Sequence, residues 1–580
     1  MGHGKFTDDL RKIKGDLKTQ SGYDVKEVYV PDDIANLDFE GDIGMPGTFP
    51  FVRGTYPRMY REKLWVRGAT PGSVRYAQDE GKTEEEAMEE MLEKAIVTTG
   101  LRSSGDCHQL ATVDPDHPLV GPDIGNCGGP LFAAWQYLHG KLGWYAKLMA
   151  RSTQGFVLEL GNACGPADVC QFTMMIATME TLGMDITKLR GNMVNDPLHV
   201  HIIRSMSYKQ PLEVGFRVST DAMEWCVKNT PLFRPTNGGC AYNMRESGIN
   251  TIQELAFRFG NYIEYTDEMV RRGISFESWG HRPAIALSGE IDFFETICKL
   301  RAARRIYARL ATERYGADPK TLRCPPCNTN LAGDSMTLQQ PIFNVIRNTI
   351  EAIASVLGGV NGMELKHYTE AISPPSPEAV TVSSAIEAII ADEANIPLVA
   401  DPLGGSYYVE WLTTRIESDV MAYLQKILDM GGMREVIKTG WLQEEVEKAA
   451  QERQRELEER QKIKVGLNAY QSLLDWPIKL PMLRRESGNP YEPWGPTQKS
   501  DWEEWETFKR NRDLSQIKPA LEHLYQVAKS DKNLIRAMVE AWKANASIGE
   551  VMGVIRAGMG FSYDQFEMVP VPEFLELSWR

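Results

Sequence analysis

The sequence predicts an α/β protein built on a TIM-type (β/α)8 barrel, with an extended arm before the barrel and a small helical domain after it. From about residue 100 to 440, short apolar runs alternate with longer amphipathic segments, as in a parallel sheet whose strands are joined by helices. The repeat is long enough to close a barrel. No G-x-G-x-x-G motif follows a predicted strand, so an open doubly wound sheet is the less favoured interpretation.

Individual elements follow from the period of the apolar residues. Helical spacing is found in four long segments of this region, residues 167–182, 252–272, 293–315 and 343–357. Short apolar runs predict strands at residues 156–160, 212–216 and 282–287.

Composition shifts divide the chain into four parts. Residues 1–60 contain many Gly and Pro and little periodicity, which predicts an extended arm lying on another part of the molecule. The barrel is expected over residues 61–480. A Pro- and Gly-rich stretch predicts a linker over residues 481–513. Helical periodicity at 517–529, 534–545 and 548–559 then predicts a helical C-terminal domain over residues 514–580.

Bulk properties restrict the class of protein. A net charge of −15 over 580 residues argues against a nucleic-acid-binding surface. The sequence has no apolar run long enough to span a membrane and no apolar signal core, so a cytoplasmic protein is expected. Nine cysteines show no disulfide framework, and Cys324-Pro-Pro-Cys327 is interpreted as a structural turn because no second ligand pair accompanies it.

Candidate site residues are the polar side chains that follow the apolar runs, because the loops after the strands form the functional face of a barrel. These residues include Asp106, Asn243, Asn330 and His367. No Ser-His-Asp arrangement can be assembled, since no G-x-S-x-G motif is present. His199 and His201 lack an identifiable third ligand, so metal binding is the less favoured interpretation. No metal site is predicted.

The tight turn at residues 401–405, in which Pro402, Gly404 and Gly405 precede an amphipathic segment, is typical of a loop at a barrel mouth. The string Asp401-Pro-Leu-Gly-Gly-Ser-Tyr-Tyr-Val-Glu-Trp411 also resembles a signature of the methylmalonyl-CoA mutase family. Further matches cover most of residues 25–470. They include the strings at 49–60, 114–118, 195–196, 246–248, 299–305, 333–340 and 430–433.

The resemblance implies a TIM barrel whose central channel takes the pantetheine arm of an acyl-CoA, and a radical rearrangement that depends on adenosylcobalamin. Family members bind cobalamin through a D-x-H-x-x-G motif in a separate domain. The similar string Asp106-Cys-His-Gln-Leu-Ala111 ends in Ala and lies within the predicted barrel. We therefore expect a small cobalamin-binding subunit as partner, in a heterotetramer or another hetero-oligomer.

Departures from the family pattern concern the acyl group. Arg204 stands eight residues after the aspartate of the Asn-Asp motif, where relatives with carboxylate substrates have Arg, and its bidentate guanidinium suits a carboxylate. Asn243 replaces the His of a Gly-Tyr-His-Met string, and an amide can donate to a thioester carbonyl but cannot act as an acid. Val194 replaces a Gln before the motif, which makes the pocket more apolar.

Other expected contacts also come from the resemblance. Arg67 begins a string, up to Gly72, that has lost the family's aromatic residue next to the substrate. Asp106 matches a polar contact of hydroxyacyl-CoA members. Arg282 matches an Arg that binds the CoA phosphates, and Lys63 replaces another.

Two main hypotheses result. The first is the large, substrate-binding subunit of an acyl-CoA mutase acting on an unusual acyl-CoA, carboxylated or bulky and different from methylmalonyl-CoA. The second is a non-catalytic pseudo-mutase that binds acyl-CoA or a partner protein, because the His, Gln and aromatic residue are replaced. A metal-dependent lyase that uses His199 and His201 is a third, weaker hypothesis.

Overall fold

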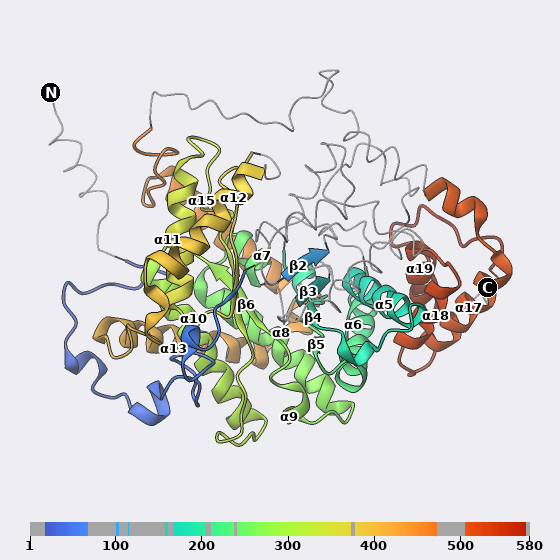
Figure 1. The fold of residues 1–580 in the computed structure, drawn as a ribbon, viewed down its shortest axis with the longest axis horizontal. Coiled ribbons are helices and arrows are strands. Elements are labelled where there is room, and N and C mark those ends of the chain that lie inside the picture. Colours follow the sequence, from blue (N-terminus) through green and yellow to red (C-terminus); the bar gives the residue numbers. More distant parts are fainter. Residues whose placement is uncertain are drawn as a thin grey trace.

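The computed structural model describes residues 18–67, 100–103, 114, 157–160, 166–203, 210–236, 241–372, 377–471 and 505–575. Within these residues the protein is a mixed α/β structure, mostly helical, with parallel sheets (Figure 1).

Eight short strands are described, and they form two parallel sheets of four. One sheet has the order β1 (Val66–Arg67), β8 (Gly362–Glu364), β7 (Cys327–Leu331) and β6 (Ile285–Gly289). The other has the order β2 (Gly100–Ser103), β3 (Val157–Leu160), β4 (Gly191–Met193) and β5 (Phe233–Arg234). Because every ladder is parallel, the carboxyl ends within each sheet share one edge.

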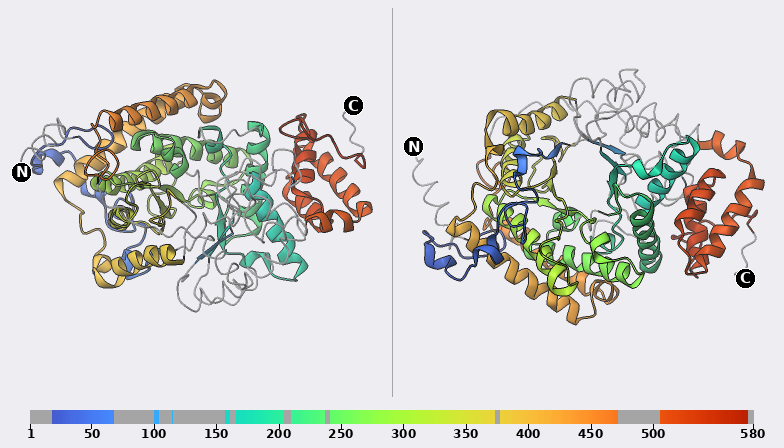
Figure 2. Two further views of the ribbon diagram at one scale, coloured as in Figure 1. Left: turned by 90° about the horizontal axis from the view of Figure 1, so that it is seen from above. Right: turned by 60° about the horizontal axis from the view of Figure 1, so that its bottom comes forward.

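This strand order is that of a ring of eight strands opened at two junctions, β1–β2 and β5–β6. At the second junction a single backbone hydrogen bond, from Ala284 N to Thr236 O at 3.2 Å, links the sheets. Figure 2 shows the two sheets facing each other across the molecule. The described strands do not form a closed ring, so the closed barrel stays a prediction.

Long helices alternate with the strands as expected. The predicted helices of this region are confirmed as α5 (Pro166–Thr181), α8 (Thr251–Arg271), α10 (Phe293–Arg309, continued by a π-helical turn at Leu310–Arg314) and α11 (Phe343–Leu357). The strands predicted at 156–160 and 282–287 are found as β3 and β6. Further helices are α7 (Ala241–Glu246), α12 (Pro377–Ala388), α13 (Tyr407–Asp429), α14 (Met433–Lys438) and α15 (Trp441–Glu458).

The strand predicted at residues 212–216 is wrong, because these residues form the first turn of helix α6 (Leu212–Asn229). In this window Leu212, Val214 and Phe216 alternate with other residues, which mimics the period of a strand. Over the full helix the buried residues continue at 218–223 and 226, which does not fit the alternation of a strand. A five-residue window could not distinguish the two periods.

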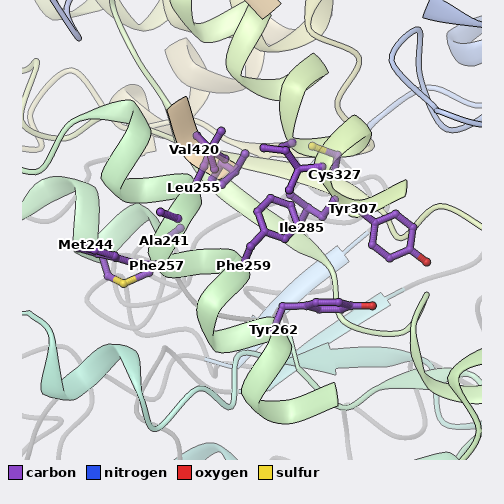
Figure 3. Close-up of a cluster of buried hydrophobic side chains, with 14 of the residues drawn as sticks. Ala241, Met244, Leu255, Phe257, Phe259, Tyr262, Ile285, Tyr307, Cys327 and Val420 are labelled. Atoms are coloured by element: carbon purple, nitrogen blue, oxygen red, sulfur yellow. The ribbon is translucent and has the colours of Figure 1, made fainter. Parts of the chain in front are cut away.

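Two hydrophobic cores fill the molecule. The larger core joins α8, α10, α11 and α13 to the β6–β8 sheet; Figure 3 shows part of it, with Phe259 of α8 near Ile285 of β6. The second core joins α5 and α6 to the C-terminal helices. The two cores therefore follow the two sheets.

The N-terminal residues form an extended arm that lies on α10 and α13 (Figure 1). Arg304 of α10 donates to the carbonyl oxygens of Phe51 and Val52, both at 2.8 Å. The ring of Tyr29 packs in a tilted arrangement against that of Tyr408 in α13, with the ring centroids 4.8 Å apart. Of the arm predicted over residues 1–60, residues 18–60 are described, and the division of the chain into four parts stays a prediction.

The C-terminal helices begin earlier than predicted. Residues 505–511, the last part of the predicted linker, are helical, and Trp505 and Phe508 are buried. The helices α17 (Leu514–Ala528), α18 (Ile535–Lys543) and α19 (Ile548–Gly558) confirm the three predicted segments. Their apolar side chains share one core with α5 and α6 and therefore pack as an extension of the β2–β5 half (Figure 1).

Two smaller predictions also concern described residues. Asp401–Gly405 form turns before α13, with Gly405 at φ +87°, a conformation that favours glycine. Cys324 and Cys327 are both free, with Cys327 buried in β7, and burial raises the pKa of both thiols. The structural interpretation of this string is therefore supported. Among the described helices, none combines the length and apolarity that crossing a bilayer requires.

Candidate active site

Four of the predicted site residues lie toward the carboxyl ends of the strands. Val194 follows β4 directly, Asn330 is the fourth residue of β7, and His367 lies three residues after β8. Asn243 is in α7, which follows β5 along the chain. The sheets therefore place these four residues on the face where barrel enzymes bind their substrates.

The β6–β8 sheet presents a polar row at this end. Along β7, Cys327, Thr329 and Leu331 are buried against the helices, whereas Asn328 and Asn330 are half-buried and lie on the opposite face. Asn330 pairs in register with Ser288 of β6 and Glu364 of β8. A hydroxyl, an amide and a carboxylate therefore occupy one layer of the inner face.

At this end of the sheet, α7, the last residue of β8 and the segment after β8 bring together four polar side chains, Tyr242, Glu246, Glu364 and Lys366, which we call the mouth cluster. Lys366 is buried, and its Nζ lies 4.4 Å from the ring centroid of Tyr242 and 4.0 Å from a carboxylate oxygen of Glu364. Gly333, which follows β7, lies close to the cluster. A Cβ at this position would lie 3.0 Å from Tyr242 Oη and 3.2 Å from Glu246 Oε2. The cluster thus combines a cation, two carboxyls and a phenol.

The electrostatics of the mouth cluster favour a protonated carboxyl. Burial and the neighbouring charge of Glu290 raise the pKa of Glu246 from 4.5 to about 7, although Lys366 and Arg245 act in the opposite direction. Burial also raises the pKa of Glu290, but Arg245, at 3.3 Å, and Lys299 outweigh it, so the net pKa of Glu290 lies below the usual value. Glu246 can therefore exchange a proton near neutral pH while Glu290 remains ionised.

The Asn195-Asp196 motif has a structural role behind the loop after β4. Both residues are fully buried, and Asn195 N donates to Asp168 Oδ2 of α5 at 2.7 Å. Asp196 accepts hydrogen bonds from Tyr265 Oη and, at 2.9 Å, from Asn261 Nδ2, both in α8. These bonds fix the first residues of the loop that contains Val194 and Arg204.

His199 and His201 lie in a 3-10 turn at His199–His201. Burial lowers the pKa of both imidazoles. His199 Nδ1 lies 2.6 Å from the carbonyl oxygen of Asp196, which can only accept, so Nδ1 carries the proton. No group of three or more potential metal ligands occurs among the described residues, and the lyase hypothesis finds no support there.

Arg282 lies at the opposite, amino end of the sheet, just before β6. Its Nη2 donates to the carbonyl oxygens of Thr230 and Phe233, at 2.9 and 2.8 Å. Arg234, His281 and Arg323 surround it and complete what we call the basic cluster. Burial and the charges of Arg323, Arg282 and Arg234 lower the pKa of His281 to about 4. Such a concentration of cations fits a strongly anionic ligand.

The remaining predicted residues differ in how far the structure describes them. Lys63 is exposed and precedes β1, so it lies at the amino end. Arg67 is in β1, but only its backbone is described. Asp106 and Arg204 lie outside the described residues.

Sequence reasoning missed the mouth cluster. Glu246 stood in a string that resembled the family and Lys366 stood beside the selected His367, yet neither has a local pattern that distinguishes a site residue from a surface charge. His367, which was selected, is buried against α12, with Nδ1 at 3.3 Å from Ser383 Oγ, and burial lowers its pKa. Its neighbour Lys366 is the residue that belongs to the mouth cluster, through its contact with the ring of Tyr242.

Comparison with known proteins adds to this geometry. A sequence profile of the family described as "Methylmalonyl-CoA mutase" matches residues 18–561. The chain is 28% identical over 561 residues to the 2-hydroxyisobutanoyl-CoA mutase large subunit of Aquincola tertiaricarbonis, covering 96% of this chain and 94% of that protein. It is 28% identical to the methylmalonyl-CoA mutase of Escherichia coli over 92% of this chain and 71% of that protein. The human mitochondrial enzyme is 26% identical, over 93% of this chain and 68% of that protein.

The strand order, the polar residues at the carboxyl ends of the strands and the extent of the sequence matches all indicate the same family. The chain belongs to the methylmalonyl-CoA mutase family, whose members are adenosylcobalamin-dependent isomerases of acyl-CoA thioesters.

Proposed function

We propose that the chain is the large, substrate-binding subunit of a two-subunit acyl-CoA mutase that acts on an acyl-CoA other than methylmalonyl-CoA. The observation on which this proposal mainly rests is the opposite chemistry of the two ends of the β6–β8 sheet. The amino end has the basic cluster around Arg282, and the carboxyl end has the mouth cluster around Lys366. A CoA thioester has the same polarity, with phosphates at one end and the reacting acyl group at the other.

A closed (β/α)8 barrel is part of the proposal. The strand order of the two sheets and the bond between Ala284 and Thr236 support it. Joining the sheets at both junctions would enclose the row of Ser288, Asn330 and Glu364 within a channel. The pantetheine arm would then pass between the basic cluster and the mouth cluster.

The residues of the mouth fit the adenosyl side of the cofactor. Glu246 Oε1 is buried and accepts no hydrogen bond from the described residues, so it is available to a hydroxyl or amino donor. Tyr242 and Lys366 add further donors next to it. When bound, adenosylcobalamin supplies a carbon–cobalt bond that breaks homolytically. The protein's own contribution is to orient the substrate and exclude water, for which amides and buried side chains are suited.

The acyl group is proposed to be carboxylated or bulky. Arg204 would form a bidentate pair with a substrate carboxylate, and the buried ammonium of Lys366 adds a positive charge at the same end of the strands. Val194 is buried where relatives have Gln, which leaves an apolar wall. Asn243 would donate to the thioester carbonyl, and Asp106 would contact a polar group of the substrate.

A separate small subunit is proposed to bind cobalamin, giving a heterotetramer or another hetero-oligomer. The printed name of the Aquincola relative, a large subunit, supports this proposal, because the match covers 94% of that protein. By contrast, the match covers only 71% of the E. coli methylmalonyl-CoA mutase.

Low-temperature EPR tests the function. The chain would be mixed with a cobalamin-binding subunit, adenosylcobalamin and, in turn, methylmalonyl-CoA, 2-hydroxyisobutanoyl-CoA, isobutyryl-CoA and a methyl-substituted succinyl-CoA. We expect a coupled cob(II)alamin–organic radical signal with one compound other than methylmalonyl-CoA. A signal with methylmalonyl-CoA alone would contradict the proposed substrate class. Binding of CoA esters without a radical signal from any compound would favour the pseudo-mutase.

A further inference from the structure

Helix α15 contacts segments that leave the carboxyl ends of strands in both sheets. Gln443 Nε2 donates to the carbonyl oxygen of His201, in the segment after β4, at 2.8 Å. Arg453, further along the same helix, forms an ion pair with Asp334, which lies three residues after β7. Helix α15 therefore connects the loops of the β2–β5 sheet with those of the β6–β8 sheet, at the end where the mouth cluster lies.

A close backbone approach fixes α15 between these two contacts. Gly248 lies two residues after α7, the helix that contains Tyr242 and Glu246 of the mouth cluster. Its φ is +109°, a conformation that favours glycine. A Cβ at Gly248 would lie 2.8 Å from Ala450 Cα and 3.0 Å from Ala450 Cβ, so a larger residue would displace α15. The helix thus packs directly against the end of α7.

The turn after α15, residues 459–469, is held in shape by its own hydrogen bonds. Asn468 Oδ1 accepts from Lys464 N at 2.7 Å, and Asn468 Nδ2 donates to the carbonyl oxygens of Leu457 at 2.9 Å and Lys462 at 2.8 Å. The turn therefore extends α15 as an ordered element, and we call the helix and the turn together the strap.

The turn of the strap binds the loop after β7 and the start of α11. Lys464 Nζ donates to the carbonyl oxygen of Asp334, and Arg347 of α11 donates to the carbonyl oxygen of Val465. Asp334 is consequently held twice by the strap, at its carboxylate by Arg453 and at its carbonyl oxygen by Lys464. Charge-assisted bonds of this kind are stronger than those between neutral groups.

The loop that the strap holds also touches the mouth cluster. Gly333, the residue before Asp334, is the position at which a Cβ would lie 3.0 Å from Tyr242 Oη and 3.2 Å from Glu246 Oε2. Within the loop, Met336 N donates to the carbonyl oxygen of Gly333 at 3.0 Å. Only one peptide bond separates the contact with the strap from the contact with the mouth cluster, so a shift of Asp334 would be transmitted to Tyr242 and Glu246.

The strap also brings two cations next to the carboxyls at this end of the strands. Burial lowers the pKa of Arg453 to about 10 and that of Lys464 to about 8, and the charges of Glu246 and Glu290 act in the opposite direction on both. Both cations are thus near enough to the mouth cluster to interact with Glu246.

We propose that the strap positions the mouth cluster, with Arg453 and Lys464 as positioning residues that hold the loop after β7 against Tyr242 and Glu246. The inference rests on the proposed function, which assigns the mouth cluster to the acyl group and the adenosyl side of the cofactor. Loss of these contacts should slow turnover and leave recognition of CoA at the opposite end of the strands intact.

Four variants and one combination separate positioning from simple stabilisation. Arg453→Gln removes the charge that holds the Asp334 carboxylate, and Lys464→Met removes the donor to the Asp334 carbonyl oxygen; the two are also combined. Arg453→Lys keeps a cation and serves as the conservative rescue. The matched control is Arg455→Gln on the same helix, because the Arg455 side chain is 59% exposed and pairs with Glu452 of that helix. Thermal unfolding of each variant would set a measuring temperature at which all are folded.

Hydrogen exchange provides a readout that is independent of turnover. In the full chain, the double variant should increase the exchange rate of amides in residues 332–340 by about tenfold, since both contacts that limit local opening of the loop are lost. Arg453→Lys and Arg455→Gln should exchange as the parent does. Unchanged exchange in the double variant would overturn the proposal.

Kinetics then test the effect on the mouth cluster. The enzyme would be assembled with its cobalamin subunit and assayed with the acyl-CoA that gives a radical signal, and calorimetry would measure the binding of CoA. We expect kcat of Arg453→Gln to fall about tenfold, because the groups at the mouth lose their alignment, and the dissociation constant of CoA to stay at the parent value. Arg453→Lys should restore most of kcat.

Two outcomes would contradict positioning. One is an equal loss of kcat and of CoA binding in Arg453→Gln, which would indicate a general effect on stability. The other is a parent-like kcat in the double variant. A parent enzyme that binds no CoA and turns over none of the acyl-CoA compounds would contradict the proposed function itself, while the exchange rates would still decide whether the strap holds the loop after β7.

Discussion

The two ends of the β6–β8 sheet differ in how their charges are neutralised. At the amino end, burial and neighbouring arginines lower the pKa of Arg234, His281 and Arg282, and the charges that shift the pKa of His281 are all positive. At the carboxyl end, Lys366 stands among Glu246, Glu364 and a tyrosine ring. The cations of the basic cluster suit an anion, whereas the mouth cluster contains charges of both signs and suits a group that needs orientation.

The largest expected effect comes from removing the cation of the mouth cluster. Lys366→Met keeps the side-chain volume and deletes the ammonium, so we expect kcat to fall about a hundredfold, as when one preorganised charged donor is lost. The dissociation constant for CoA should not change. Steady-state kinetics and calorimetry measure the two effects. The matched control is Lys426→Met, whose ammonium lies 4.8 Å from the ring of Trp441 on an exposed helix face, and kcat should stay at the parent value.

The proton of Glu246 is expected to make stability depend on pH. Its folded pKa of about 7 exceeds the ordinary 4.5, so its stabilising contribution is complete below pH 4.5 and is lost as the pH rises through 7. Compared with the parent, Glu246→Gln should lose less unfolding free energy between pH 4.5 and 8, by roughly 3 kcal/mol. Urea unfolding at several pH values measures this difference. If the unfolding free energies of parent and variant change in parallel with pH, the proton is bound by another group. Glu444→Gln, on an exposed helix face, controls for the change in net charge.

At the amino end, Arg323→Ala should weaken CoA binding about tenfold and leave kcat unchanged, since a single exposed charge-assisted contact is worth about 1.4 kcal/mol. Arg323 is exposed, so the fold should tolerate its loss. Added salt should weaken the parent's binding more than the variant's. Lys320→Ala removes a nearby exposed charge and is expected to bind CoA as the parent does. A loss of kcat in Arg323→Ala would mean that the two ends do not act separately.

The smallest expected effect is a titration shift at His281. In the free protein its pKa is about 4, because burial and three arginines disfavour the imidazolium. An anion bound at the basic cluster would offset those charges and raise the pKa by about one unit. NMR titration of the imidazole with and without CoA measures the shift. If the protein binds CoA and the pKa of His281 does not change, the phosphates bind at another place.

Periodicity and family strings predicted much of the architecture. The long helices α8, α10, α11 and α13 were readable because their apolar residues repeat over many turns. The short strand predicted at 212–216 failed because five residues fit either period. Residues chosen because they follow a strand, such as Val194 and Asn330, do lie at the carboxyl ends. Their roles with substrate remain proposals.

By itself the sequence determined the alternation of strands and helices and the family. Local patterns are sufficient for these properties. Only the tertiary structure decided which charges meet. The approach of Lys366 to Tyr242, the proton affinity of Glu246 and the ion pair of Arg453 with Asp334 join residues distant along the chain. Their energies depend on burial and distance, and neither quantity is encoded in any short stretch of sequence.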